Sequence, residues 1–166
     1  MGIKANVGDV FLVPLDCQSW AVGQLISAWN EELYVTIFDK KTEARELDLS
    51  ATLNLNSALF ALTLDAKLFH GDWPILGNVD ENLDRFPQPA FKVRQSGVVY
   101  IESRDRTVSR PASPSEAEIL RYRSVSYPAI IEEAAQGYFG FCEWNAHFDK
   151  FRPEYAIFSS RLLNGE

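Results

Sequence analysis

The stretch VGDVFLVPLDCQSWAVGQLI, residues 7–26, decides the fold because it predicts one β-hairpin. Residues 10–15 are apolar on both faces of an extended chain, which is typical of a strand covered front and back. The polar run Asp16–Ser19 suits a turn, and a second strand-like run, Trp20–Ile26, follows it. Gly23 inside that run indicates a bulge or the close approach of another backbone. We therefore expect a central strand in a sheet that bends towards closure.

Further strands are predicted along the next eighty residues. Leu33–Asp39 is rich in β-branched and aromatic residues, and Ala58–Leu64 is a short apolar run that fits a buried strand or a core helix. A second hairpin is expected from Ala90–Arg94 and Gly97–Glu102, with a further strand at Thr107–Ser109. The pattern indicates a β-rich antiparallel sheet, strongly bent or closed into a partly open barrel.

The character of the chain changes at Pro111. Ser113, Pro114 and Glu116 form the capping-box pattern, which predicts a helix over Pro114–Arg123. A second short helix is expected over Pro128–Gln136, ended by Gly137, and the last thirty residues are aromatic throughout. The fold class is therefore α+β. A chain of 166 residues is long enough for one core, so we expect a single domain, with a β-rich scaffold over 7–110 and a helical, aromatic part over 111–166.

The composition limits the function. The net charge is −7, from 23 acidic and 16 basic residues, which argues against nucleic-acid binding and favours a basic partner if the partner is charged. Moderate acidity also has a simpler explanation, since it keeps proteins soluble. No stretch reaches the roughly 18 apolar residues of a membrane span, and residues 1–6 are not followed by the apolar core of a signal peptide. We expect a cytoplasmic protein without a membrane partner.

Two possible chemical sites are weak. Cys142 and His147 offer a thiol and a base, the pattern of a small cysteine-dependent enzyme, but both lie in one short aromatic segment. Neither Cys142 nor Cys17 has the spacing of a zinc, redox or disulfide framework, so we expect free thiols. His70 and Asp72 are too few ligands for a metal site. The sequence predicts no catalytic residue, no metal and no cofactor.

Exposed acidic residues are the better candidates for partner binding. Asp80, Glu81 and Asp84 lie in a loop predicted over Val79–Pro89, where functional residues are often found. Upstream, Asp72 belongs to a turn signal at Gly71-Asp72, and Trp73 and Pro74 stand between it and a second turn signal at Gly77-Asn78. Trp73 could anchor a partner or close the end of the sheet, and we favour the second role. A second acidic group comprises Glu31, Glu32, Glu43 and Glu46. For any one residue of either group, ordinary solvated surface is a more common role than partner contact.

A series of short motifs in fixed order resembles the Immunity protein 26 family of bacterial polymorphic-toxin systems. The motifs span roughly residues 7–125 and are Gly8-Asp9-Val10-Phe11, Val13-Pro14-Leu15, Ala21-Val22-Gly23-Gln24, Phe38-Asp39, Gly71-Asp72-Trp73-Pro74-Ile75-Leu76-Gly77-Asn78, Pro89-Ala90-Phe91-Lys92 and Arg110-Pro111-Ala112-Ser113 with Glu116 and Leu120. The chain departs from the family pattern after Arg123, because residues 137–166 are longer and more aromatic. The resemblance implies a non-enzymatic protein that is encoded beside a toxin and neutralises it in the producing cell. If that toxin acts on nucleic acid, its cleft must be basic, and an acidic inhibitor can occupy it.

Overall fold

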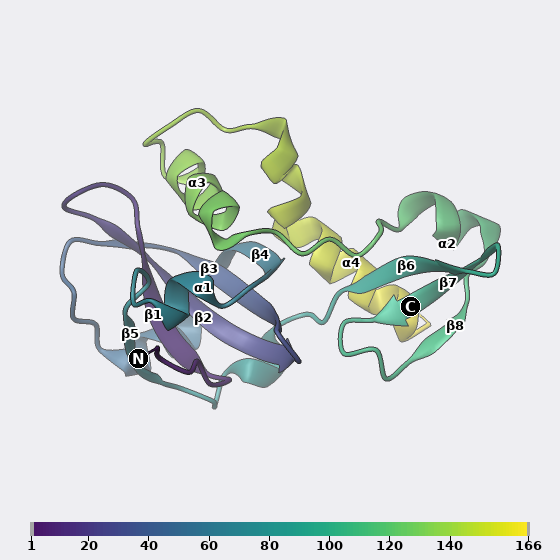
Figure 1. The fold of residues 1–166 in the computed structure, drawn as a ribbon, viewed down its shortest axis with the longest axis horizontal. Helices are drawn as coiled ribbons and strands as arrows, with labels where there is room; N and C mark the ends of the chain where they lie inside the picture. The colour runs from purple at the N-terminus through teal and green to yellow at the C-terminus, as the bar shows by residue number, and fades with distance from the viewer. Residues whose placement is uncertain (1, 166) are drawn as a thin grey trace. The chain divides into compact units, whose positions relative to one another are not determined.

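The computed structural model describes residues 2–165, which divide into two compact units (Figure 1). Unit 1 contains the chain up to Phe86 together with Val125–Arg152. Unit 2 contains Pro87–Ser124 and the chain from Pro153 onwards. Each unit therefore combines an early segment with a late one. The single domain expected over residues 1–166 stays a prediction.

Unit 1 is built on a five-stranded antiparallel sheet in the order β4-β3-β2-β1-β5. Figure 1 shows these strands side by side in purple to teal. Its strands are β1 (Asp9–Pro14), β2 (Trp20–Trp29), β3 (Glu32–Thr42), β4 (Ser57–Thr63) and β5 (Ile75–Asn78). Its helices are α1 (Ala66–Phe69) and α3 (Pro128–Tyr138), with 3₁₀ turns η1 (Leu49–Asn54), η2 (Leu83–Arg85) and η3 (Ala146–Phe151). The α+β class is confirmed, and the sheet formed by the described residues is open, with β4 and β5 at its edges.

The predicted hairpin is present as β1 and β2, with Val10 opposite Gln24 and Pro14 opposite Trp20. One carboxylate oxygen of Asp16 accepts hydrogen bonds from the backbone amides of Gln18 and Ser19. These bonds, led by the one from Gln18, lower the pKa of the Asp16 carboxyl. The turn between the strands is thus stabilised by a side chain that the sequence places inside it.

Gly23 lies where the sheet bends. The register between β2 and β3 shifts between Ala21 and Gly23, as expected of a bulge. A Cβ added at Gly23 would lie 2.5 Å from the ring of Phe11, so the ring occupies the space that a side chain would need. The Phe11 ring therefore packs directly against the backbone of β2 at Gly23.

Both faces of the sheet are covered, which explains why β1 is apolar on each side. On one face Phe11 stacks on Trp73, with ring centroids 5.4 Å apart and planes 3° from parallel. The same cluster includes α3 and η3 residues, namely Ile131, Ala134, Ala135, Phe148 and Phe151. The other face carries aromatic rings in contact with one another, from Tyr34, Phe38, Phe60 and Phe86. The run predicted over Ala58–Leu64 therefore forms strand β4, Ser57–Thr63, in a two-sided core, and the alternative of a core helix is wrong.

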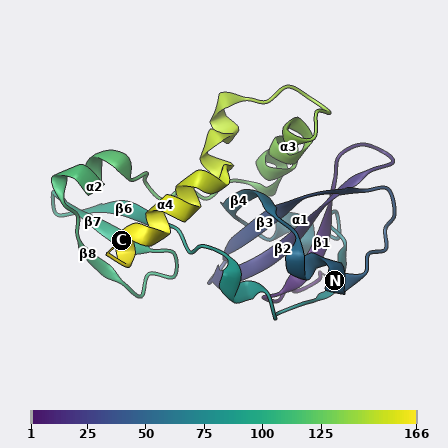
Figure 2. The ribbon, with the colours of Figure 1, turned by 180° about the vertical axis from the view of Figure 1, so that it is seen from behind.

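Unit 2 contains a three-stranded antiparallel sheet in the order β6-β7-β8. Its elements are β6 (Ala90–Gln95), β7 (Val98–Ser103), β8 (Ser109–Pro111), α2 (Pro114–Ile119) and α4 (Pro153–Leu163). The β6-β7 hairpin was predicted, and its turn uses Ser96 and Gly97 at φ values of 50° and 80°. Figure 2 shows α4 lying along β6, where the Tyr155 hydroxyl donates to the Ala90 carbonyl at 2.8 Å. This link joins the last helix to the sheet of the same unit.

The structure corrects two predicted helix ends. The capping box is present, but α2 ends at Ile119, because Leu120 is extended and the following residues pair with β6. Gly137 lies inside α3, and the helix stops two residues later at the Phe139 cap. There Gly140 has φ +84°, and the Phe141 amide donates to the Gln136 carbonyl, a Schellman ending.

Two strand and turn predictions also shift. Gly77-Asn78 was expected to form a turn, but it belongs to β5 and pairs with β1 at Val10 and Asp9. The strand expected at Thr107–Ser109 begins later, as β8, because Asp105 accepts hydrogen bonds from Thr107 and forms a turn there. Pairing with β1 decides the first boundary, and a local turn at Asp105 decides the second.

Candidate partner-binding surface

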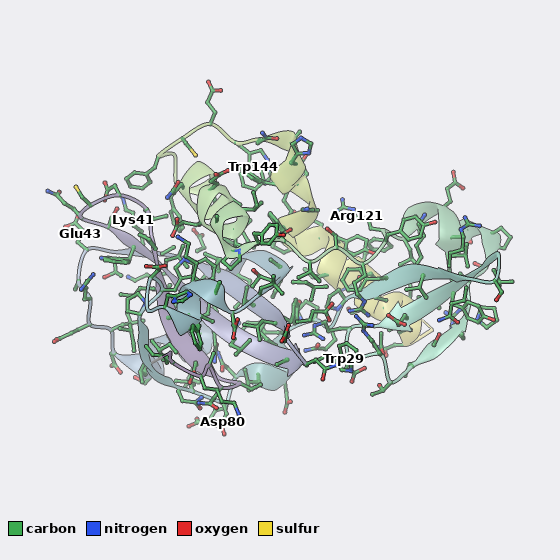
Figure 3. The ribbon with its side chains drawn as sticks, viewed as in Figure 1. Trp29, Lys41, Glu43, Asp80, Arg121 and Trp144 are labelled. Atoms are coloured by element: carbon green, nitrogen blue, oxygen red, sulfur yellow. The ribbon has the colours of Figure 1, made fainter. Side chains whose placement is uncertain are left out.

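The segment Val79–Phe86, called the acidic loop below, carries three of the predicted partner-binding residues. Asp80, Glu81 and Asp84 are all exposed. Figure 3 shows Asp80 at the periphery of unit 1. Among the described residues none of the three carboxylates forms an ion pair, so their charges stay available to a partner.

The acidic loop is fastened to the sheet by a pair of buried amides. The Gln24 amide nitrogen donates to the Asn82 side-chain oxygen at 3.1 Å, and the Asn82 nitrogen donates back to Gln24 at 2.8 Å. Gln24 also donates to the Val79 carbonyl at 2.8 Å. Because buried amides are costly without partners, this reciprocal arrangement holds one loop geometry. We call Gln24 and Asn82 the amide pair.

A second set of contacts fixes the point where the loop leaves β5. The Val79 amide donates to the Gly8 carbonyl at 3.0 Å, and the Asn78 side chain donates to the Asp9 carboxylate at 3.0 Å. Gly8 has φ +95°, and a Cβ there would lie 2.7 Å from the Val79 carbonyl oxygen. Glycine is thus required by both the backbone conformation and the close approach.

The far end of the loop is anchored by Arg85 and Phe86. The Phe86 ring packs near Phe38 and Phe60, with centroids about 6 Å away. The Arg85 guanidinium donates to the carbonyls of Thr52 and Leu55 and lies 4.6 Å from the Phe86 ring. Burial lowers the pKa of Arg85. The Arg85 cation therefore faces backbone carbonyls. The acidic loop is thus attached to the rest of unit 1 at both of its ends, with its three carboxylates exposed between them.

The structure places the other two predicted site residues differently. Asp72 is exposed, whereas Trp73 has 0% exposure. The Trp73 indole N–H donates to a Glu132 carboxylate oxygen at 3.1 Å. The Trp73 ring stacks on Phe11 inside the core of unit 1 and has no exposed area, so it is left out of the binding surface proposed below. His70 is exposed, and no group of three or more potential metal ligands occurs within residues 2–165.

The second acidic group is split by burial. Glu31, Glu43 and Glu46 are exposed, but Glu32 is 6% exposed. Figure 3 shows Glu43 well apart from Asp80 within unit 1. The three exposed glutamates therefore form a control for the acidic loop, with the same charge in another place.

The cysteine-enzyme alternative gains no support. Cys17 and Cys142 are exposed free thiols. The Cys142 thiol donates to the Glu133 carbonyl at 3.7 Å, and the backbone of His147 is held by the Asn145 side chain. The part of the chain that the structure describes has no hydrogen bond between Cys142 and His147.

Sequence reasoning missed the amide pair. Gln24 interrupts an apolar strand, and a polar residue in such a run is a usable signal, but its partner is 58 residues away. The motifs Gly8-Asp9, Gly23-Gln24 and Gly77-Asn78 were singled out one by one. The structure shows that all three surround the base of the acidic loop.

The fold and the site define a class of protein: an α+β scaffold whose short motifs hold an exposed acidic loop in one place. The family model of Immunity protein 26 matches residues 6–99, more than half of the chain, and the chain belongs to that family. No curated protein and no solved structure matches it. The family match includes all of β1–β5 and the acidic loop and ends in β7, so the motifs from Arg110 onwards lie outside it.

No helix within residues 2–165 combines the length and the apolar character needed to cross a bilayer.

Proposed function

We propose that this protein binds a cognate polymorphic toxin and neutralises it in the cell that produces both. Membership of the Immunity protein 26 family supports this function, because the family implies binding without catalysis. The proposed partner is the toxin encoded beside the gene. The proposed location of the complex is the cytoplasm of the producing cell.

The acidic loop is the observation that carries the proposed mode of binding. Its three carboxylates are exposed and lack ion-pair partners among the described residues, while the amide pair fixes the backbone beneath them. A toxin that acts on nucleic acid needs a basic cleft for phosphates, and carboxylates on a fixed loop can occupy such a cleft. Asp72 is also exposed and is proposed as a separate contact with the toxin. Complementary charge of this kind acts mainly on the rate of association.

Co-expression with the protein encoded by the neighbouring gene tests the function. The expected result is restored growth of cells that express the neighbouring protein, together with a complex measurable by calorimetry. Cells carrying an empty plasmid supply the control for expression load. If the pair shows neither rescue nor binding, the proposed function is overturned.

A further inference from the structure

The two units differ in charge. Unit 1 contains 17 acidic and 8 basic residues, a net charge of −9, whereas unit 2 contains 6 acidic and 8 basic residues, a net charge of +2. The acidity that argued for a basic partner therefore belongs to unit 1. Unit 2 has positive charges for which the proposed function gives no role.

Several of these positive charges lie along one edge of the small sheet. The segment Arg121–Arg123 runs parallel to β6, with Tyr122 bridged to Lys92. The Lys92 amide donates to the Arg121 carbonyl at 2.9 Å, and the Arg121 amide is held by the Tyr155 hydroxyl at 3.0 Å. Backbone pairing thus attaches this segment to β6, and the Tyr155 hydroxyl attaches it to α4. We call Lys92, Arg94, Arg121 and Tyr122 the cationic edge.

Two cations of the cationic edge lie over tyrosine rings, one exposed, Tyr122, and one buried, Tyr155. The Lys92 ammonium lies 4.8 Å from the centre of the Tyr122 ring, which is 52% exposed. A hydrogen bond from Arg94, with the charges of Arg94 and Lys92, lowers the pKa of the Tyr122 phenol. The Arg121 guanidinium lies 4.7 Å from the Tyr155 ring and is exposed. Cations held over rings are ordered before any partner arrives.

The cations of this edge differ from other arginines of unit 2. Arg110 pairs with Glu116 and Arg123 pairs with Glu102, each at 2.7 Å. No carboxylate among the described residues forms an ion pair with Lys92, Arg94 or Arg121. The fold pairs two arginines internally and leaves Arg94 and Arg121 exposed. The half-buried Lys92 ammonium donates to the Ala117 carbonyl at 2.7 Å and has no carboxylate partner in the described part of the chain.

We infer that the cationic edge is a second contact region for the toxin and receives a carboxylate-rich segment of it. This inference rests on the proposed function and extends it, since the toxin then presents basic surface to unit 1 and acidic surface to unit 2. Arginine binds carboxylates through two parallel hydrogen bonds, so Arg94 and Arg121 supply direction as well as charge. Because the two regions carry opposite charge, each selects a different surface of the toxin.

A nucleic acid fits the cationic edge less well. Three cations neutralise at most about three phosphates, which gives weak and strongly salt-dependent binding. The net charge of −7 on the whole chain opposes a polyanion at any distance inside the Debye length. One face of the Tyr122 ring is already covered by Lys92, which halves the surface for stacking a base. A short acidic protein segment carries fewer negative charges than a nucleic acid, so the net charge of the chain repels it less, and it needs no free aromatic face for stacking.

The variant Arg94→Gln/Arg121→Gln tests the inference. Both side chains are exposed, and the backbone groups that hold the edge are kept. The matched control is Lys4→Gln/Lys40→Gln, which removes the same charge from exposed positions in unit 1. Calorimetry with the neighbouring gene's toxin should give a dissociation constant at least about tenfold higher for the edge variant and within about twofold of wild type for the control. Circular dichroism confirms that both variants are folded.

Each other outcome counts against the inference. An edge variant that binds as tightly as wild type overturns it and leaves the proposed function standing. Equal weakening in edge variant and control also overturns it, because total charge then decides. A single-stranded oligonucleotide that binds wild type but not the edge variant, with toxin affinity unchanged, assigns the edge to nucleic acid. If wild type itself does not bind the toxin, the proposed function fails and the inference fails with it.

Discussion

Unit 1 and unit 2 both contain an antiparallel sheet, but different interactions stabilise them. Unit 1 has a core on both faces of its sheet and neutral amide hydrogen bonds at the base of its acidic loop. Unit 2 has a small core of Ala90, Ile101 and Leu120, supplemented by ion pairs and a capping box. A large apolar core is insensitive to pH, whereas ion pairs depend on protonation. Unit 1 also has ion pairs, Lys67–Glu132 at 3.6 Å and Arg152–Asp149 at 3.3 Å, but both are longer than those of unit 2. The acidic unit is thus stabilised mainly by its core, and the carboxylates of its acidic loop stay available for binding.

The largest loss of stability is expected from Trp73→Ala in unit 1. The change removes a ring with 0% exposure that stacks on Phe11, and it leaves a Glu132 oxygen without its indole donor. The free energy of unfolding should fall by about 3–5 kcal/mol. Denaturant titration measures this free energy. The control is Tyr127→Ala, which removes a ring that is 72% exposed and should change stability little.

The same titration sharpens the comparison of the units. All four tryptophans belong to unit 1, so tryptophan fluorescence follows unit 1, while circular dichroism follows both units. A single cooperative domain predicts coincident midpoints by both probes in wild type and in Trp73→Ala. Separate midpoints would contradict the single domain proposed for residues 1–166.

A smaller loss is expected when the amide pair is broken. Asn82→Ala leaves the Gln24 amide without its reciprocal partner inside the protein, at a cost of about 1–3 kcal/mol. Gln88→Ala, at an exposed amide nearby in the sequence, is the control. Chemical denaturation compares the two, and equal stability of both variants would show that the amide pair does not hold the loop.

Neutralising the acidic loop should change binding and leave stability alone. In Asp80→Asn/Glu81→Gln/Asp84→Asn the association rate with the toxin should fall roughly tenfold at low salt and depend less on ionic strength. Glu31→Gln/Glu43→Gln/Glu46→Gln is the matched control, with three exposed charges removed elsewhere in unit 1. Stopped-flow measurements over a range of salt concentrations give the association rate of each variant. A loop variant that associates at the wild-type rate rules out the acidic-loop model.

The smallest change in stability is expected from breaking the Arg110–Glu116 ion pair of unit 2. The Arg110 guanidinium and the Ser113 amide lower the pKa of Glu116 to about 2 from an ordinary value of 4.5. A lowered carboxyl pKa stabilises the fold above pH 4.5, and this contribution is lost as the pH falls from 4.5 towards 2. Glu116→Gln should therefore be less stable than wild type at pH 7 and converge with it near pH 2.

Thermal unfolding followed by circular dichroism checks this prediction. Glu118→Gln, an exposed position on the same helix, should keep the wild-type dependence on pH. If the gap between Glu116→Gln and wild type stays constant from pH 7 to pH 2, the ion pair is not the cause.

Much of the fold followed from local patterns. The hairpin at residues 7–26, the β6-β7 hairpin and the capping box at Ser113 were predictable because their hydrogen bonds join residues close in sequence. The exposed loop around Asp80 followed from its polar composition. The predicted end of α2 was wrong because a distant contact ends the helix: Leu120 is extended, and the residues after it pair with β6.

The sequence by itself determined which residues are apolar, acidic or suited to turns, and hence the α+β class and the list of candidate charges. Only the tertiary structure decided that Trp73 is buried, that Gln24 meets Asn82, and that opposite charges belong to different units. The physical reason is range. Propensities and caps act over a few residues, whereas the burial of a ring, the pairing of two amides and the sharing of charge between surfaces depend on contacts between segments tens of residues apart.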